Sequence, residues 1–286
     1  MRRSRRRTDA RSFIRCGGAR RTAMPERVVV GWDGSRAAEA ALDWALRHEP
    51  DCREVELVVA AGRRETSAGS AETAAARLRE ADPDRTVTVA REQRPAWSAL
   101  AARSAPDVLV VVGGADPRAG RHRSSTAYRV AAAARGPVAM VPEGFDHGRD
   151  VVLGVGDDTT APSVALAAAE HAARRRQRLV AVHAWRQFLD LDTMADPAPG
   201  HDAQVAKERD AVLRVALAPV EDRYPGLPVV HRVLHGRPVD AVLGAATSAS
   251  LLVLGRDASV DRRRGRPVAH VALLSSRVPV LVVPRG

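Results

Sequence analysis

Polar and glycine residues follow directly on an early apolar run of the chain. The run VVVGW at 28–32 leads into Asp33, Gly34 and Ser35. A carboxylate at the end of a buried strand can accept hydrogen bonds from a ribose hydroxyl or an adenine amine. Gly34 lets the backbone turn, and Ser35 can cap a following helix through its hydroxyl. The pattern therefore fits either a nucleoside site or an ordinary capped turn without a ligand.

A second group of residues could hold a phosphate. The stretch VVVGGADPRAGRHRSST at 110–126 places Gly113 and Gly114 at a strand end and Ser124 and Ser125 at a helix start. Backbone N–H groups of a glycine turn, together with a helix N-terminus, can cradle a phosphate group. The stretch between them carries Arg118, Arg121 and Arg123. These arginines would line a phosphate loop or belong to a solvated charged loop.

Other reactive residues give weaker signals. His231 and His235 are four residues apart, which would suit a metal on a helix, but they flank a predicted strand and are expected to point apart. We expect His183 and His270 to be packing residues. Asp157 and Asp158 fit a magnesium pair or a helix N-cap equally well. No Gly-x-Ser-x-Gly, Walker or zinc pattern occurs, so we predict no catalytic residue and no metal site.

The elements that must position these residues are short Val-rich runs alternating with Ala-rich helical patterns. Strands that are apolar on both faces and separated by helices predict a parallel sheet covered on both sides. The predicted fold class is α/β, with two tandem, doubly wound, Rossmann-like units. Strands of the first unit are expected at 28–32, 55–60, 86–90, 108–112 and 138–141, with helices at 35–47, 70–81, 95–104 and 124–134. In the second unit the pattern begins with strand 151–155, helix 162–176 and strand 179–184, and it ends with strand 278–283.

Internal repetition defines the two units. ARGPVAMVP at 134–142 recurs as SRVPVLVVP at 276–284, and the repeat indicates a duplicated fold. We predict one domain over 26–143 and another over 149–286, with the boundary at 144–149. Extra residues in the second copy fall in the acidic, proline-containing stretch 187–204, which predicts a surface loop.

Charge and composition narrow the function classes. The net charge is +11, but residues 1–23 hold nine arginines and one acidic residue, so the rest of the chain is nearly balanced. That segment is interpreted as a basic disordered tail or as an upstream stretch that is not translated. Nucleic acid is therefore not an expected partner of the two domains. No apolar run of 18 residues predicts a membrane span, and two cysteines form no disulfide framework, so a cytoplasmic location is expected.

Several ordered blocks together resemble a known family. VVVGWDGS at 28–35, combined with the strand–Gly–loop–Ser-Ser–helix–GPVAMVP element, is similar to the universal stress protein family in its tandem two-domain form. The second copy adds LVAVHAW at 179–185, VLHGRP at 233–238 and RPVAHVALLSSRVPVLVVP at 266–284, which resemble actinobacterial members. The resemblance covers about residues 26–284. It implies a five-stranded parallel α/β domain in each copy and, in some members, adenine-nucleotide binding.

The nucleotide-binding members share an Asp after the first strand and a loop of the form Gly, two residues, Gly, nine residues, Gly, Ser or Thr. In the first copy, Asp33, Gly113 and the hydroxyl of Ser125 match this pattern. Asp116 replaces the second glycine, Ser124 replaces the last one, and the loop is two residues shorter. Because a carboxylate inside a phosphate cradle is repulsive, the resemblance implies at most weak ATP binding in the first domain.

The second copy departs further from the pattern. Gly156 stands at the position of Asp33, Ala258 replaces the second loop glycine, and Arg266-Pro267 replaces the final Gly-Ser. Proline has no N–H to donate, and an arginine side chain obstructs a backbone cradle. No ATP or other cofactor is expected in the second domain.

The resulting prediction is a non-catalytic stress-response regulator or scaffold. The resemblance implies that the two units pack as an internal pseudo-dimer in which the final strands, 138–141 and 278–283, meet. The sequence leaves a further homodimer and a protein partner open. Two alternatives stay open as well: an ATP-using ligase or pyrophosphatase of a related α/β class, and nucleic-acid binding through the basic tail.

Overall fold

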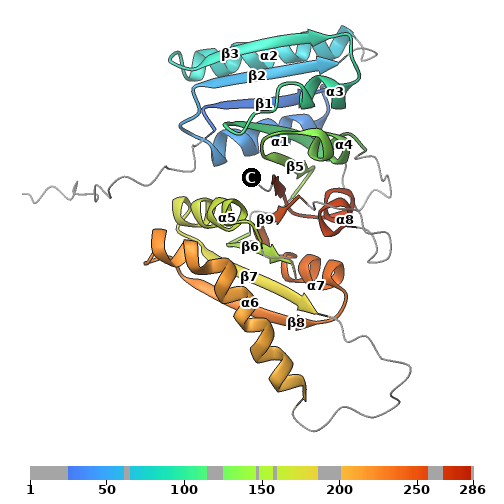
Figure 1. Cartoon of the computed structure of the whole chain (residues 1–286). Coiled ribbons are helices and arrows are strands. Elements are labelled where there is room, and N and C mark those ends of the chain that lie inside the picture. The colour runs from blue at the N-terminus through green and yellow to red at the C-terminus, as the bar shows by residue number, and fades with distance from the viewer. Residues whose placement is uncertain are drawn as a thin grey trace, which may run out of the picture.

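One ten-stranded sheet runs through both halves of the chain. The computed structural model describes residues 25–60, 65–114, 125–145, 148–156, 160–185, 201–256 and 267–284. The strand order is β3-β2-β1-β4-β5-β10-β9-β6-β7-β8. Figure 1 shows the first half above the second, with β5 and the C-terminal strand meeting between them.

The first half alternates strands and helices over its whole length. Its elements are β1 (Arg27–Trp32), α1 (Arg36–His48), β2 (Glu54–Ala60), α2 (Glu65–Ala81), β3 (Thr86–Glu92), α3 (Ala96–Ala101), β4 (Val108–Gly114), α4 (Ser125–Ala133) and β5 (Val138–Pro142). All pairings within this half are parallel, as the sequence predicts.

The second half repeats the arrangement. Its elements are β6 (Asp150–Val155), α5 (Pro162–Arg174), β7 (Arg178–Trp185), α6 (His201–Arg223), β8 (Val229–His235), α7 (Pro238–Ala245), β9 (Ala249–Gly255), α8 (Val268–Ser275) and β10 (Val280–Val283). Its pairings are parallel too, and the order β8-β7-β6-β9-β10 matches β3-β2-β1-β4-β5.

The two halves join through their last strands. β5 and β10, which the resemblance expects to meet, form an antiparallel pair in which Val280 faces Met140 and Val282 faces Val138. All three backbone-paired positions of β10 are buried, and so are their partners. The antiparallel junction makes one continuous sheet out of two parallel ones.

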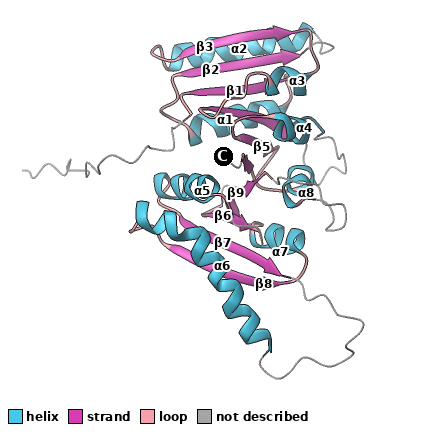
Figure 2. Cartoon of the chain, in the orientation of Figure 1, coloured by secondary structure: helices cyan, strands magenta, loops and turns pink. Residues whose placement is uncertain are grey.

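Helices cover both faces of this sheet (Figure 2). One core cluster contains buried residues of α1, α2, α5 and α6 together with the strand residues that point toward them, such as Val28 and Val30. The other cluster contains buried residues of α3, α4, α7 and α8 and the alternate strand residues, such as Val29. Small alanines on the helices let them approach Val-rich strands closely, so the sheet is buried on both faces.

Part of the predicted loop at 187–204 is wrong. Residues 201–204 belong to α6, and residues 186–200 lie outside the described part of the chain. The start of α6, HDAQVAKERD, is rich in helix-forming Ala, Gln, Lys, Glu and Arg, so helix propensity continues up to the proline-containing stretch before it. In the same way α2 begins at Glu65, ahead of the predicted residue 70.

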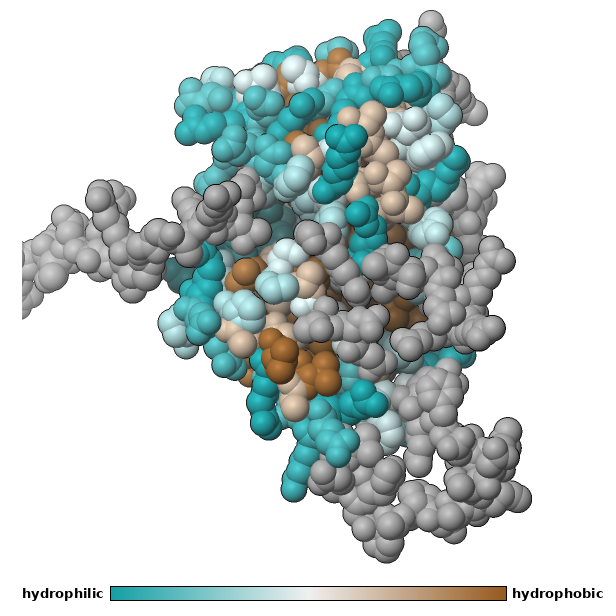
Figure 3. Space-filling model, viewed as in Figure 1, coloured by the Kyte–Doolittle hydropathy of each residue, from teal (hydrophilic) through white to brown (hydrophobic). Residues whose placement is uncertain are grey.

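The viewed surface is mostly hydrophilic (Figure 3). Apolar side chains gather over α6, the helix that carries Val215, which is 63% exposed. Among the described helices, none has the length and apolar character that crossing a membrane requires. The predicted basic tail at 1–23 lies outside the described residues.

Candidate nucleotide-binding turn at the first switch point

The predicted site residues meet where the strand order reverses. β1 pairs with β2 on one side and with β4 on the other, and Gly31 lies opposite Val112. Asp33 directly follows β1, and Gly113 lies at the end of the neighbouring parallel strand β4, so both lie at the same edge of the sheet. In open α/β sheets, this crevice between diverging crossovers is where ligands bind.

Asp33 and Ser35 form a capped turn. The Asp33 Oδ1 atom accepts a hydrogen bond of 3.1 Å from the Ser35 N–H. The Ser35 hydroxyl accepts one of 3.2 Å from the Ala38 N–H, which makes Ser35 the N-cap of α1. Gly34 has φ of +73°, a left-handed conformation that favours glycine. The structure thus shows that Ser35 caps α1 and that the Asp33 Oδ1 atom is engaged within the turn.

Replacing the cap measures its contribution. Because Ser35→Ala removes the acceptor of the Ala38 N–H, we expect the free energy of unfolding to fall by about 1 kcal/mol. Ser35→Asp keeps a capping oxygen and should lie within about 0.5 kcal/mol of the parent protein. Denaturant titration followed by circular dichroism compares the three proteins; equal losses in both variants would contradict a capping role.

Two serines of α2 close over the same turn, and the sequence analysis missed them. The Ser67 hydroxyl donates to the Asp33 carbonyl at 2.9 Å. The Trp32 indole N–H donates to the Ser70 hydroxyl at 3.0 Å, and that hydroxyl donates to the Ser67 carbonyl at 3.0 Å. The available signal was the Ser-x-x-Ser spacing at 67–70, which puts both hydroxyls on one helix face after the neighbouring strand.

The two loop glycines have packing partners. A Cβ atom on Gly113 would lie 2.5 Å from the backbone C and O of Ala37, in the first turn of α1. On Gly114 it would lie 2.5 Å from the Met140 sulfur. Close approach of the α1 backbone therefore requires glycine at position 113, whether or not a phosphate binds, whereas a side chain at position 114 would require the Met140 side chain to shift.

The remaining predicted contacts lie outside the described part of the chain. Ser124, Asp116 and the loop arginines fall in the range 115–124, and the side chain of Ser125 at the start of α4 is also outside the description. The structure brings Asp33, Gly34, Gly113 and Gly114 to one edge.

The second switch point, between β6 and β9, carries different side chains. His183 of β7 is fully buried, and its Nδ1 atom lies 3.1 Å from the Val155 carbonyl oxygen. Arg256 directly follows Gly255 at the end of β9, in the position that Gly114 holds in the first half. Its guanidinium group donates a hydrogen bond to the Ala134 carbonyl at the end of α4, in the first half.

The histidine pair is not arranged as predicted. His231 and His235 both lie in β8, where a spacing of four puts them on the same face and about 13 Å apart. The expectation that they point apart is wrong, because the whole segment is strand. His231 Nδ1 lies 3.0 Å from Asp210 Oδ1, and this hydrogen bond lowers the pKa of Asp210. Within the described ranges, no group of three or more His, Cys, Asp or Glu residues could hold a metal ion.

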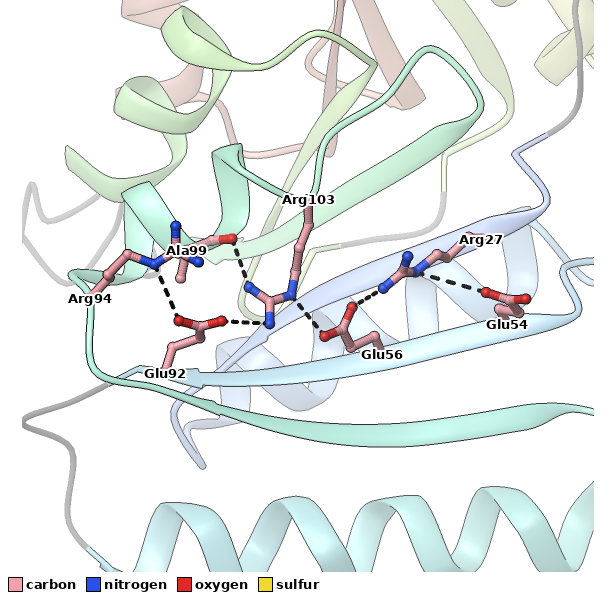
Figure 4. A network of polar contacts seen from close by, with 7 residues as sticks. All are labelled: Arg27, Glu54, Glu56, Glu92, Arg94, Ala99 and Arg103. Atoms are coloured by element: carbon pink, nitrogen blue, oxygen red, sulfur yellow. Dashed lines mark hydrogen bonds and ion pairs between the residues drawn. The ribbon is translucent and has the colours of Figure 1, made fainter.

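A buried carboxylate in the first half is held by ion pairs (Figure 4). Glu56 of β2 contacts Arg27 of β1 and lies 2.7 Å from the Arg103 Nε atom. Arg103 also lies 2.7 Å from Glu92 of β3 and donates to the Ala99 carbonyl at 3.0 Å. With both oxygens of Glu56 engaged by guanidinium groups, this network ties three strands and α3 together and offers no group suited to proton transfer.

Comparison with known proteins places the chain in a family. The universal stress protein family model matches residues 148–284. A universal stress protein of Mycobacterium tuberculosis is 32% identical over 252 residues, which cover 80% of this chain and 85% of that protein. Another from the same organism is 32% identical over 177 residues, or 59% of this chain and 55% of that relative, so the match spans about half of that relative's length.

Solved structures share the fold. A functionally unknown protein from Pseudomonas aeruginosa superimposes with a TM-score of 0.63 at 15% identity, covering 92% of this chain and 94% of its own. A universal stress protein from Archaeoglobus fulgidus gives 0.60 at 15% identity, covering 92% and 99%. Together with the sequence matches, the repeated 3-2-1-4-5 strand order and the Asp-Gly-Ser turn after β1 lead to one conclusion: this chain belongs to the universal stress protein family.

Proposed function

We propose that the chain is a non-catalytic stress-response regulator or scaffold. Its two halves act as an internal pseudo-dimer, with at most weak adenine-nucleotide binding in the first half and none in the second. The observation that carries this proposal is that polar groups at the first switch point are hydrogen-bonded within the chain itself. There Asp33, Ser35, Ser67 and Ser70 bond to the chain's own backbone and to one another, and α1 packs directly on Gly113.

A regulator needs a stable surface more than a reactive centre. The continuous sheet, with its antiparallel junction of buried residues, supports a fixed relation between the halves. The alternative of an ATP-using ligase or pyrophosphatase requires a base beside the Gly113 loop. Two carboxylates follow strands in the described part of that edge: Asp33, which accepts a hydrogen bond within its own turn, and Glu143, whose N–H donates to the Gly114 carbonyl. We propose that neither acts as such a base.

Calorimetric titration of the full chain with ATP tests the proposal. We expect a dissociation constant no tighter than about 1 mM. Asp33→Asn keeps an oxygen for the Ser35 N–H and so preserves the turn, and any residual nucleotide affinity in the first half should change in this variant. The matched control is Asp240→Asn, an exposed carboxylate on α7 of the other half.

Two further measurements complete the test. Mass spectrometry of natively purified protein should find no stoichiometric adenine nucleotide. Steady hydrolysis of ATP above background by the parent protein, lost in Asp33→Asn, would replace this proposal with the enzyme alternative. Tight ATP binding without hydrolysis would instead favour a nucleotide-dependent switch over a scaffold.

A further inference from the structure

At the contact between the two halves, arginines of the second half bind acceptor groups of the first half. We call it the seam: the β5–β10 pair together with the ends of α1 and α5 on one face and of α4 and α8 on the other. On the first face, Arg174 Nη1 of α5 lies 2.8 Å from Glu49 Oε2, at the end of α1. Glu49 is only 2% exposed there. A guanidinium group of the second half therefore neutralises a buried carboxylate of the first.

The neighbouring arginine makes a contact in the same direction. Arg175 Nη1 donates to the Arg47 carbonyl oxygen, in the last turn of α1, at 3.4 Å. The unsatisfied carbonyls at a helix C-terminus carry partial negative charge, which a cation stabilises. Here again the second half supplies the positive group and the first half supplies the acceptor.

A third contact lies on the opposite face of the sheet. The Arg256 guanidinium reaches from the end of β9 to the last turn of α4, where it donates to the Ala134 carbonyl and, at 3.4 Å, to the Ala131 carbonyl. Nearby, the rings of Tyr128 on α4 and His270 on α8 lie 3.8 Å apart. Both faces of the seam thus carry arginine contacts that run from the second half to the first.

Corresponding positions in the two halves carry different groups. The buried residues of α1, from Ala37 to Ala45, match those of α5, from Val164 to Ala172, at an offset of 127. Glu49 therefore corresponds to Arg176, His48 to Arg175 and Arg47 to Arg174. Counted from Gly113 and Gly255, the position of Arg256 corresponds to Gly114, which has no side chain to reach α8. The halves share a fold, but their seam surfaces are not copies of each other.

This difference decides which pairs can form. A pair of two second halves would bring two copies of Arg174 and Arg175 together without Glu49. A pair of two first halves would put His48 in the place of Arg175 and would leave the end of α4 without Arg256. Leaving a buried charge without its partner typically costs several kcal/mol.

We propose that the seam is a heterotypic interface, in which the second half recognises the first half and neither recognises a copy of itself. The proposal rests on the pseudo-dimer of the proposed function and adds its selectivity. The partner that this surface fits is the complementary half, from the same chain or, by exchange, from a second copy of the chain.

The full chain itself provides the test. A protease site inserted in the linker at 144–149 is cut after folding, and native mass spectrometry at pH 8 identifies the complexes. That pH is above the pKa of about 7 that burial gives Glu49, so the carboxylate is ionised. We expect complexes of one first-half and one second-half fragment. Complexes of two like fragments would overturn the selectivity, whereas two separate monomeric fragments would overturn the pseudo-dimer as well.

Charge exchange identifies the contact responsible. Arg174→Glu should weaken the complex of the nicked chain roughly a hundredfold, and adding Glu49→Arg should recover at least about tenfold. Arg232→Glu on β8, exposed and at the far edge of the sheet, is the matched control and should change nothing. If Arg174→Glu weakens the complex no more than Arg232→Glu does, the proposal fails. The nucleotide prediction is independent of this result, because the ATP titration uses the uncut chain.

Discussion

Gly113→Ala is expected to lower the free energy of unfolding by about 3 kcal/mol. The added methyl group would lie 2.5 Å from the backbone C and O of Ala37 and 2.9 Å from the Ala38 N atom. Backbone atoms cannot rotate away as a side chain can, so α1 must move off β4. Equilibrium denaturation of the full chain measures the loss.

The control for this substitution lies in a neighbouring helix. A Cβ on Gly69, inside α2, meets nothing within 4 Å, so Gly69→Ala should stabilise the protein by about 0.5–1 kcal/mol. If Gly113→Ala were as stable as the parent protein, the packing explanation for this glycine would be wrong. A ligand contact would then be the better account of why glycine stands there.

The second large effect is a dependence of stability on pH, caused by three buried groups at the seam. Burial, reinforced by nearby Arg175, lowers the pKa of His48 from 6.5 to about 3. Burial beside Arg174 and Arg175 lowers the pKa of His171 to about 4. Burial raises the pKa of Glu49 from 4.5 to about 7, although Arg174 opposes the shift.

The signs of these pKa shifts determine whether stability rises or falls as the pH falls. Below pH 6.5 the unfolded chain protonates both histidines while the folded chain keeps them neutral, so their contribution to stability is lost as the pH falls. Glu49 has the opposite effect on stability. Its carboxyl group stays protonated up to about pH 7 in the folded chain but only up to about pH 4.5 in the unfolded chain, so this group stabilises the folded state as the pH falls. Between pH 6.5 and 4.5 the unfolded chain therefore binds one proton more, and stability should fall by about 1.4 kcal/mol per pH unit.

Single substitutions change that slope predictably. His171→Gln removes one of the two histidine protons, so stability should become nearly independent of pH between 6.5 and 4.5. Replacing His48 as well should reverse the slope, since Glu49 alone would remain. His235→Gln, an exposed histidine of β8, should leave the parental slope unchanged. Denaturant titrations at four pH values measure all four proteins; a parental slope in His171→Gln would exclude this origin.

Much of the fold could be predicted because its signals are local. Val-rich runs bounded by glycine and proline gave every strand of the first half to within two residues. The repeat of GPVAMVP as VPVLVVP, together with the family resemblance, predicted that β5 and β10 are equivalent and meet. The start of α6 was missed because its helix-forming residues follow directly on a turn-rich stretch.

The sequence predicts which residues form the turn at the candidate site, but not which tertiary contacts those residues make. The residue types at Asp33, Gly34, Gly113 and Gly114 place a turn at the switch point, yet the same types serve a ligand or a helix cap. The approach of Ser67 and Ser70 from α2 to this turn is a tertiary contact that no local pattern encodes. The role of Arg256 was equally hidden, because its acceptors lie more than a hundred residues earlier in the sequence.

Joining the halves back to back also removes two surfaces that favour aggregation. An unpaired outer strand is a template for adding strands from other molecules. In the described part of the chain, β5 and β10 pair with each other, so only β3 and β8 are edge strands of the sheet. β3 ends in Arg91 and Glu92, and β8 carries Arg232 between two histidines. Charged side chains on such outer strands oppose growth into fibres, so fusing the two copies in one chain also protects the protein from polymerising through its own sheet.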